Sequence, residues 1–298
     1  MLEKDLFVEL IVEAAAPLPP RDAPHLNEPL ELLTHPERLP ALDGIRAVLL
    51  DVYGTLFSSA AGDIGVGTDY KRGNLDALAR EAAPGLTGEE LKDYFRSAVL
   101  AEHASRFPTT PYPEVRVEEL WARLPQLAEG FDCRELALRF ELAVNPSYPE
   151  EGLKASLSAL RAAGLPLGIV SNAQFFTPLL FSAFLGGPPE ACGFESDLIV
   201  YSFERGEAKP APSLFASVRD ALAVRGIAAG EALYLGNDML NDVYAARSAG
   251  FRTCLFAGDA RSLRLREDNR LCRGLIPDAV IRSLVDLPTL VGVKQGKA

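Results

Sequence analysis

Residues 48–59 read VLLDVYGTLFSS, in which an apolar run ends at Asp51 and a turn through Tyr53, Gly54 and Thr55 follows. A short, nearly continuous apolar run is typical of a strand that is buried on both faces of a parallel sheet. Ligands of such sheets bind at the carboxyl ends of the strands, and Asp51 stands at that end. The stretch therefore predicts a parallel α/β sheet with a carboxylate in its site.

Further along the chain, apolar runs alternate with helical patterns. We expect strands at 45–51, 165–171, 197–202, 232–236 and 252–256. We expect helices at 152–164, 213–226 and 242–250. This alternation predicts a doubly wound parallel sheet, Rossmann-like in architecture, with helices on both of its faces.

The interval between the first two strands differs, because it shows helix signals and no comparable strand. Thr87 and Glu90 fit a capping box, and Asp132 and Glu135 fit its aspartate analogue. We therefore expect an inserted α-helical cap domain. The expected division is a core made of 45–59 and 149–298, a cap over 60–148, and an N-terminal arm over 1–44. Residues 15–44 are rich in proline, which indicates an extended surface segment, and residues 1–14 are a candidate contact for a homo-oligomer.

The composition argues against several classes of function. The 298 residues include 30 Lys and Arg against 41 Asp and Glu, for a net charge of −11. Such a surface repels phosphate backbones and anionic lipids, so we expect neither nucleic acid nor a membrane as partner. The four cysteines form no CxxC pair, which argues against zinc and indicates a reducing compartment. We expect a cytoplasmic protein that acts on a small molecule.

Polar side chains stand at the ends of four successive strands. They are Asp51 after the first, Ser171 and Asn172 at the second, Lys209 after the third, and Asp238 and Asp242 after the fourth. Each alone has an ordinary explanation as a helix cap, a turn residue or a solvated charge. Because the carboxyl ends of parallel strands share one edge of the sheet, the whole set predicts one active site.

The motifs DVYGT, VSN, KP and GNDMLND, in this order, resemble those of the haloacid dehalogenase superfamily over about residues 45 to 290. The resemblance implies that Asp51 is the nucleophile and forms a covalent intermediate. It implies that Ser171 bonds the transferring group, with Asn172 beside it. It also implies that Lys209 neutralises the nucleophile and the phosphoryl oxygens.

The same resemblance implies a Mg²⁺ site, since hard oxygen ligands suit this ion. Its ligands would be Asp51, the backbone carbonyl of Tyr53, Asp238 and Asp242. Gly54 and Thr55 would form the tight turn that aims backbone donors at the bound anion.

Tyr53 departs from the pattern of the phosphatases in this superfamily, which carry a second aspartate at this position as the acid and base. A phenol has a pKa of about 10 and is a poor base at neutral pH. The haloacid dehalogenases of the superfamily carry tyrosine here, because a halide leaves without a proton. Tyr53 alone therefore favours dehalogenation.

The fourth motif favours phosphatase chemistry instead. A dehalogenase works without metal on a carboxylate substrate, and an uncompensated Asp238 or Asp242 would repel it by about 3 kcal/mol each at ~5 Å. We therefore predict a Mg²⁺-dependent phosphatase that acts on a small phosphorylated metabolite through an aspartyl phosphate. A metal-independent 2-haloacid dehalogenase is the first alternative, and a catalytically degenerate ligand-binding protein is the second.

The group that would replace the second aspartate stays open at this point. It is either the substrate itself, as with an acyl phosphate, or a side chain of the cap. The candidates from the cap are Tyr70, Lys71, Arg72, His103, Arg106, Tyr112 and Arg116.

Overall fold

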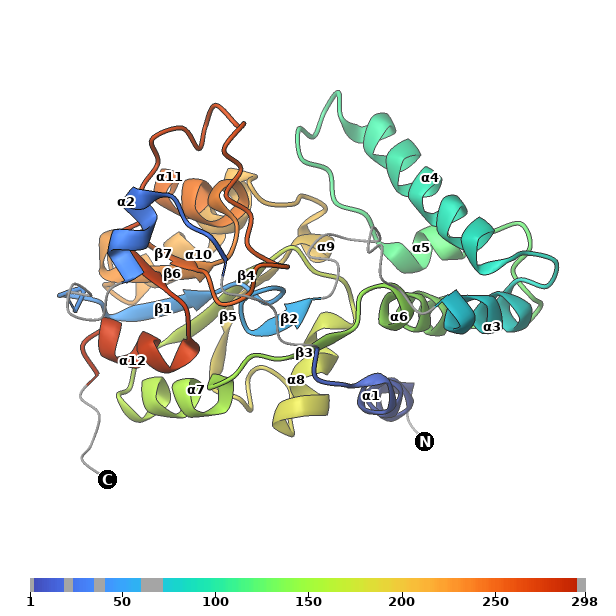
Figure 1. Ribbon diagram of the computed structural model, residues 1–298, viewed down its shortest axis with the longest axis horizontal. Coiled ribbons are helices and arrows are strands. Elements are labelled where there is room, and N and C mark those ends of the chain that lie inside the picture. The colour runs from blue at the N-terminus through green and yellow to red at the C-terminus, as the bar shows by residue number, and fades with distance from the viewer. Residues whose placement is uncertain (1–2, 19–23, 35–40, 60–71, 294–298) are drawn as a thin grey trace.

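The computed structural model describes residues 3–18, 24–34, 41–59 and 72–293. Its centre is a six-stranded parallel sheet with the strand order β5-β4-β1-β6-β7-β8 (Figure 1). The strands are β1 (Ala47–Leu50), β4 (Leu167–Ser171), β5 (Phe194–Tyr201), β6 (Ala232–Gly236), β7 (Arg252–Phe256) and β8 (Ala279–Ile281). The predicted parallel α/β fold is confirmed.

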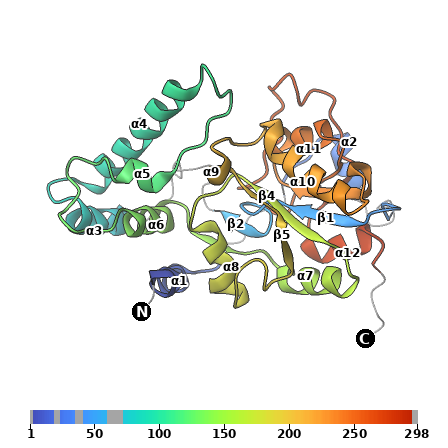
Figure 2. The same cartoon turned by 180° about the vertical axis from the view of Figure 1, so that it is seen from behind.

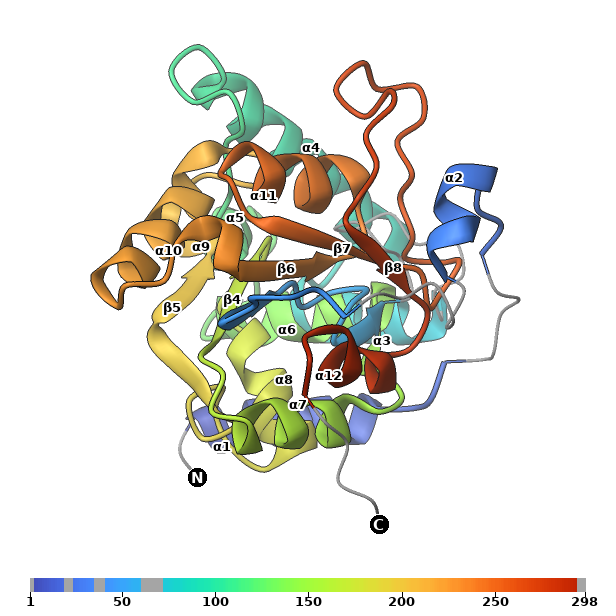
Figure 3. The ribbon, with the colours of Figure 1, turned by 90° about the vertical axis from the view of Figure 1, so that its left-hand side faces the viewer.

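Helices cover both faces of this sheet, as the doubly wound architecture requires. Figure 3 shows α10 (Pro212–Val224) and α11 (Ala245–Ser248) on one face, and α7 (Leu153–Ala162) and α12 (Leu287–Leu290) on the other. Every residue of β1, β4 and β6 is buried, which explains their continuous apolar runs. The chain leaves β1 for β4 on one side and reaches β6 on the other, so a ligand crevice is expected at the end of β1.

Four helices lie together beside the sheet, between β2 (Phe57–Ser59) and β3 (Ser147–Pro149), which pair antiparallel (Figure 1). They are α3 (Arg72–Ala82), α4 (Gly88–Arg106), α5 (Val117–Trp121) and α6 (Cys133–Val144). Their core is aromatic: the Trp121 ring stacks on Phe95 with centroids 5.1 Å apart and contacts Phe140 at 4.9 Å. The predicted helices of this segment are confirmed, whereas the β2–β3 pair was not predicted.

The helix starts of this segment follow the capping signals in the sequence. Thr87 Oγ1 accepts from the backbone N–H of Glu90 at 3.2 Å, and the Glu90 carboxylate accepts from the N–H of Thr87 at 2.7 Å. The predicted capping box is thus confirmed. Asp132 caps α6 by accepting from the N–H of Arg134 at 2.8 Å, while Glu135 pairs with Arg139 at 3.1 Å.

The buried carboxylate of Glu114 links this helical segment to the core through hydrogen bonds. The Ser202 hydroxyl donates to Glu114 Oε2 at 2.6 Å, and Gln174 donates to the backbone carbonyl of Val115 at 3.0 Å. Alongside, the backbone N–H of Glu114 donates to the carbonyl of Gly206 at 3.1 Å. The segment is therefore attached close to the loop that carries Lys209.

The N-terminal helix α1 (Glu3–Ala14) packs against its own chain. Phe7 and Ile11 are each only 1% exposed, and the helix contacts α8 (Thr177–Leu185) and α6 (Figure 2). Residues 3–14 are thus part of the folded chain, and the oligomer contact stays a prediction. Parts of the proline-rich stretch, 19–23 and 35–40, lie outside the described residues. No helix within the described ranges is long and apolar enough to cross a membrane.

Candidate active site

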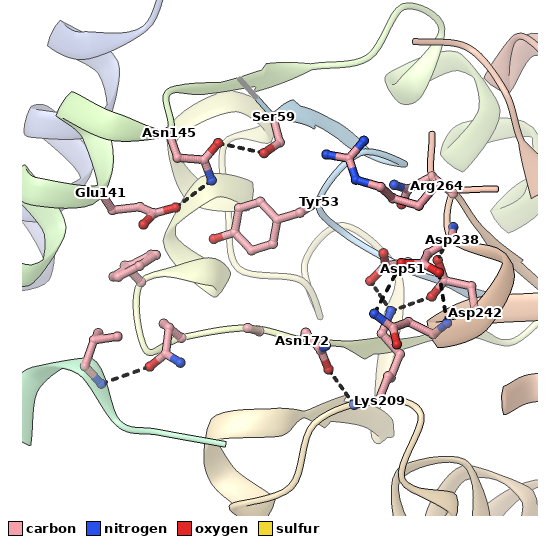
Figure 4. A pocket seen from close by; sticks show the side chains of 16 residues that line it. Asp51, Tyr53, Ser59, Glu141, Asn145, Asn172, Lys209, Asp238, Asp242 and Arg264 are labelled. Carbon is pink, nitrogen blue, oxygen red and sulfur yellow. Dashed lines mark hydrogen bonds and ion pairs between the residues drawn. The ribbon is translucent and has the colours of Figure 1, made fainter. Parts of the chain in front are cut away.

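A cavity lies at the carboxyl ends of β1, β4 and β6, where the sheet meets α6 (Figure 4). Six of the predicted site residues line it: they are Asp51, Tyr53, Asn172, Lys209, Asp238 and Asp242. Ser171, Gly54 and Thr55 lie next to it without lining it. The strand ends therefore converge as the fold predicts.

Lys209 joins two of the carboxylates. Its Nζ lies 2.8 Å from Asp51 Oδ1 and 2.6 Å from Asp242 Oδ1, and 3.1 Å from the Tyr234 hydroxyl. Burial alone would lower the pKa of Lys209, but Asp242 and Asp51 raise it above its usual value. The side chain is therefore an ammonium ion placed against the predicted nucleophile.

Asp242 is held on both of its oxygens. Oδ1 accepts from Lys209 and Tyr234, and Oδ2 accepts from the backbone N–H of Asp238 at 2.8 Å. Burial raises the pKa of Asp242, and the Lys209 ammonium opposes that rise. A Cβ atom at Gly236 would lie only 2.3 Å from the Asp242 carboxyl carbon, so the glycine makes room for this carboxylate.

Asp238 is held by an arginine that the sequence did not connect with the site. Arg266 Nη2 lies 2.6 Å from Asp238 Oδ2, and its Nε lies 3.0 Å from the same oxygen. The other oxygen accepts from the backbone N–H groups of Leu240 at 2.8 Å and Asn241 at 3.1 Å. The carboxylate is thus neutralised by Arg266 and also caps the following helical turn.

These contacts decide how well the site fits Mg²⁺. All four carboxylate oxygens of Asp238 and Asp242 already accept hydrogen bonds, and Asp51 Oδ1 faces Lys209. Within the described ranges, no three Asp, Glu, His or Cys side chains converge as a metal-binding group. As arranged, the residues do not fit the ion, and the predicted magnesium ligands stay a prediction.

The same contacts differ from the charge balance that the sequence predicts, in which Asp238 and Asp242 are uncompensated without a metal. In the structure Arg266 compensates Asp238, whereas Asp242 shares the single charge of Lys209 with Asp51. The repulsion expected between Asp238 and a carboxylate substrate is therefore reduced, and Asp238 no longer discriminates between phosphatase and dehalogenase chemistry.

The turn after β1 is tightly packed. Gly54 has φ of 77°, and a Cβ atom there would lie 2.7 Å from Asn237 Nδ2 and from Ser262 Cβ. The buried Thr55 hydroxyl donates to Asn237 Oδ1 at 3.1 Å. Both predicted turn residues thus fix the turn against the loop after β6, and neither of them lines the cavity.

The end of β4 contributes Ser171 and Asn172. Ser171 is fully buried, and its hydroxyl donates to the carbonyl of Asn172 at 3.2 Å. The Asn172 side chain lines the cavity, and its Oδ1 accepts from the backbone N–H of Lys209 at 2.7 Å. Asn172 therefore positions the lysine loop.

Tyr53 projects into the cavity as a neutral phenol. Its hydroxyl lies 3.0 Å from Thr177 Oγ1, which also accepts from the N–H of Gln174 at 3.0 Å. Burial, and secondarily the charge of Glu141, raise the pKa of Tyr53 well above its usual value. The prediction that residue 53 provides no base at neutral pH agrees with this environment.

The candidates for an acid and base in the helical segment do not reach the cavity where the structure describes them. His103, Arg106, Tyr112 and Arg116 are absent from its lining. Arg106 instead donates to the carbonyls of Glu114 and Gly206. Tyr70, Lys71 and the side chain of Arg72 lie outside the described residues.

Several polar side chains of the cavity were not predicted from the sequence. Among them are Glu141 of α6, Asn145 at the end of that helix, and Arg264 of the loop after β7 (Figure 4). Glu141 and Asn145 are one helical turn apart, a spacing that many solvated helix faces share. Arg264 belongs to the basic run RSLRLR, for which a solvated loop is the ordinary interpretation.

Several proteins whose sequences are similar to this chain are named phosphatases. The chain is 28% identical to phosphoglycolate phosphatase of Photorhabdus laumondii over 269 residues, which cover 85% of this chain and 94% of the relative. It is 25% identical to phosphoglycolate phosphatase of Xylella fastidiosa, over 75% and 84% of the two chains. It is also 39% identical over 122 residues to phosphoserine phosphatase of Thermus thermophilus, covering 40% of this chain and 45% of the relative.

Solved structures share the fold. A phosphatase from Thermococcus onnurineus aligns with a TM-score of 0.54 at 21% identity, over 84% of this chain and 99% of that one. A 2-haloacid dehalogenase from Pseudomonas syringae aligns with a TM-score of 0.53 at 23% identity, over 83% and 98%. The profile of the haloacid dehalogenase-like hydrolases matches residues 45–250, and the chain belongs to this family.

Proposed function

We propose that the protein is a phosphomonoester hydrolase that transfers the phosphoryl group of a small metabolite to Asp51 and then to water. The observation that carries the proposal is the contact of 2.8 Å between Asp51 and the Lys209 ammonium at the end of β1. The phosphatase names of the curated relatives support this choice of substrate. The four helices between β2 and β3 would act as the cap, and we place the protein in the cytoplasm.

In the first step an oxygen of Asp51 forms a bond to phosphorus while the bond to the leaving oxygen breaks. Lys209 stays protonated beside Asp51 and offsets the negative charge of the nucleophile and of the phosphoryl oxygens. The leaving oxygen takes its proton from water or from the substrate itself. Water then attacks phosphorus, which releases inorganic phosphate and restores the Asp51 carboxylate.

Magnesium remains part of the proposal only as an ion that has to compete with Arg266. Asp238, if free of Arg266, would be the residue to hold the ion, which would supply positive charge for the phosphoryl oxygens. No step above depends on it.

A 2-haloacid dehalogenase is the second candidate, because residue 53 is a neutral tyrosine. In that reaction Asp51 would attack the carbon that bears the halogen, and the halide would leave without a proton. A protein that only binds its ligand is the third candidate.

One panel separates the three candidates. Phosphate release is measured with phosphomonoesters and acyl phosphates, and halide release with 2-haloacids, for the wild type and for Asp51→Asn. Phosphate release that the variant loses supports the proposal, and halide release that it loses supports the dehalogenase. Ligand binding without turnover, retained in Asp51→Asn, supports the third candidate.

A further inference from the structure

Glu141 lies across the cavity from the predicted nucleophile. Figure 4 shows its carboxylate beyond the Tyr53 ring, on the opposite side from Asp51. It belongs to α6, whereas Asp51 and Tyr53 belong to the end of the first core strand. A substrate held at Asp51 and extending along the cavity would meet Glu141 with its remote end.

The position of this carboxylate is fixed from one side. Asn145 Nδ2 donates to Glu141 Oε1 at 2.7 Å, and Asn145 Oδ1 accepts from the Ser59 hydroxyl at 2.7 Å. Ser59 ends β2, so the chain of hydrogen bonds joins the helical segment to the core. Such a fixed carboxylate is suited to orient a ligand.

The other side of the carboxylate is open to the cavity. No described residue donates a hydrogen bond to Glu141 Oε2, and no described arginine or lysine forms an ion pair with Glu141. Asp238, by contrast, has Arg266 as its counter-ion. Burial raises the pKa of Glu141 to about 7, as expected of a carboxylate without a cation beside it.

We infer that Glu141 selects substrates that carry an ammonium group at the end remote from the phosphoryl group. This inference rests on the proposed phosphatase activity. An ammonium would supply the hydrogen-bond donors that Glu141 Oε2 lacks and a positive charge for this half-buried carboxylate. The ring of Tyr53 beside it adds an aromatic face, which also attracts cations.

Two features favour a role of Glu141 in substrate recognition over a role in proton transfer. The Tyr53 ring stands between Glu141 and Asp51 in Figure 4, so Glu141 is not adjacent to the leaving oxygen of a group bound at Asp51. The cavity wall also includes the apolar side chains Val117 and Phe176, which would enclose a short carbon chain. A short aminoalkyl phosphate matches this arrangement.

The test compares matched esters on the wild type and on Glu141→Gln. The pairs are 2-aminoethyl phosphate with propyl phosphate, and 3-aminopropyl phosphate with butyl phosphate. For each enzyme, kcat/KM of the amine ester is divided by kcat/KM of the alkyl ester. The ratio of the wild type is then divided by the ratio of Glu141→Gln, which removes differences in the leaving group. We expect this quotient to be about 10 to 100, the range of a charged hydrogen bond. Glu129→Gln, an exposed residue of the same helical segment, serves as the control and should leave both ratios unchanged.

A binding measurement keeps the two proposals apart. Calorimetry with 2-aminoethylphosphonate and propylphosphonate needs no turnover, and the wild type should prefer the amine by the same factor while Glu141→Gln should not. A quotient near 1 with normal phosphate release overturns the role of Glu141 and leaves the phosphatase proposal intact. A preference in binding without phosphate release from any ester overturns the phosphatase proposal instead. No preference in either measurement overturns the inference.

Discussion

The Nζ atom of Lys209 lies 2.8 Å from Asp51 and 2.6 Å from Asp242, so one ammonium ion joins carboxylates that follow two neighbouring strands. The contact exists because β1 and β6 pair in parallel and end at the same edge of the sheet. The nucleophile of the proposed reaction is therefore held against a residue that itself remains charged.

Replacing Lys209 by Met should abolish most of the activity and also destabilise the fold. Two buried carboxylates would lose their counter-ion, at a cost of about 3 to 5 kcal/mol for a broken buried pair. We expect kcat to fall by about 10²- to 10³-fold. Phosphate release and urea unfolding measure the two effects, and Lys154→Met, at an exposed lysine, is the control. Activity within threefold of the wild type would contradict the role of Lys209.

Arg266→Ala should increase the affinity for Mg²⁺ or Mn²⁺. The substitution removes the guanidinium from Asp238 Oδ2, and charged hydrogen bonds of this kind contribute about 1.5 to 3 kcal/mol. A gain of about tenfold or more in metal affinity follows, and titration calorimetry with either ion measures it. Arg225→Ala, which removes a surface pair with Glu195 and Asp197, should show no gain. Unchanged or weaker binding in Arg266→Ala would show that Arg266 and the metal do not compete.

The rate should depend strongly on the leaving group, because Tyr53 stays neutral and no predicted acid from the helical segment lines the cavity where the chain is described. An aryl or acyl phosphate should react at least about 10² times faster than an alkyl phosphate, the contribution that a general acid makes. Tyr53→Phe should leave this ratio unchanged. It should lower the free energy of unfolding by about 1 kcal/mol, because the hydrogen bond between Tyr53 and Thr177 is lost. A ratio near 1 in the wild type, or its collapse in Tyr53→Phe, would mean that an acid is present.

Glu141→Gln should stabilise the empty protein at alkaline pH. Because the pKa of Glu141 is raised to about 7, its contribution to stability is fully present below the pKa of the unfolded chain and is lost as pH rises through about 7. The neutral amide avoids this loss, so the variant should gain up to about 2 kcal/mol over the wild type at pH 8 and little at pH 4. Urea unfolding at the two pH values measures the difference. An equal effect at both pH values would contradict the raised pKa of Glu141.

The sequence predicts the sheet well because buried parallel strands are nearly continuous apolar runs. The five strands expected from Ile45 to Phe256 are present, whereas β2, β3 and β8, each of three residues, are too short for any periodicity to be recognised. The convergence of Asp51, Lys209 and Asp242 follows from the strand order alone.

The rest of the site depends on contacts that strand order does not determine. Arg266 reaches Asp238 from a loop after β7, and it adopts a left-handed φ of 52° that a basic run in the sequence does not indicate. The prediction that Asp238 has no counter-ion in the protein was therefore wrong, because Arg266 pairs with it. Glu141 is held at the cavity by Asn145, which accepts a hydrogen bond from Ser59 of β2, a tertiary contact that helical spacing does not predict.

Asp51→Asn provides the most direct test of the central claim, which is that Asp51 acts as a phosphoryl acceptor. Inorganic phosphate released from a panel of phosphomonoesters is measured for the wild type and the variant at equal concentration, with halide release from 2-haloacids in parallel. We predict phosphate release by the wild type and a loss of at least about 10³-fold in Asp51→Asn. Halide release without phosphate release, or phosphate release that Asp51→Asn retains, would contradict the account.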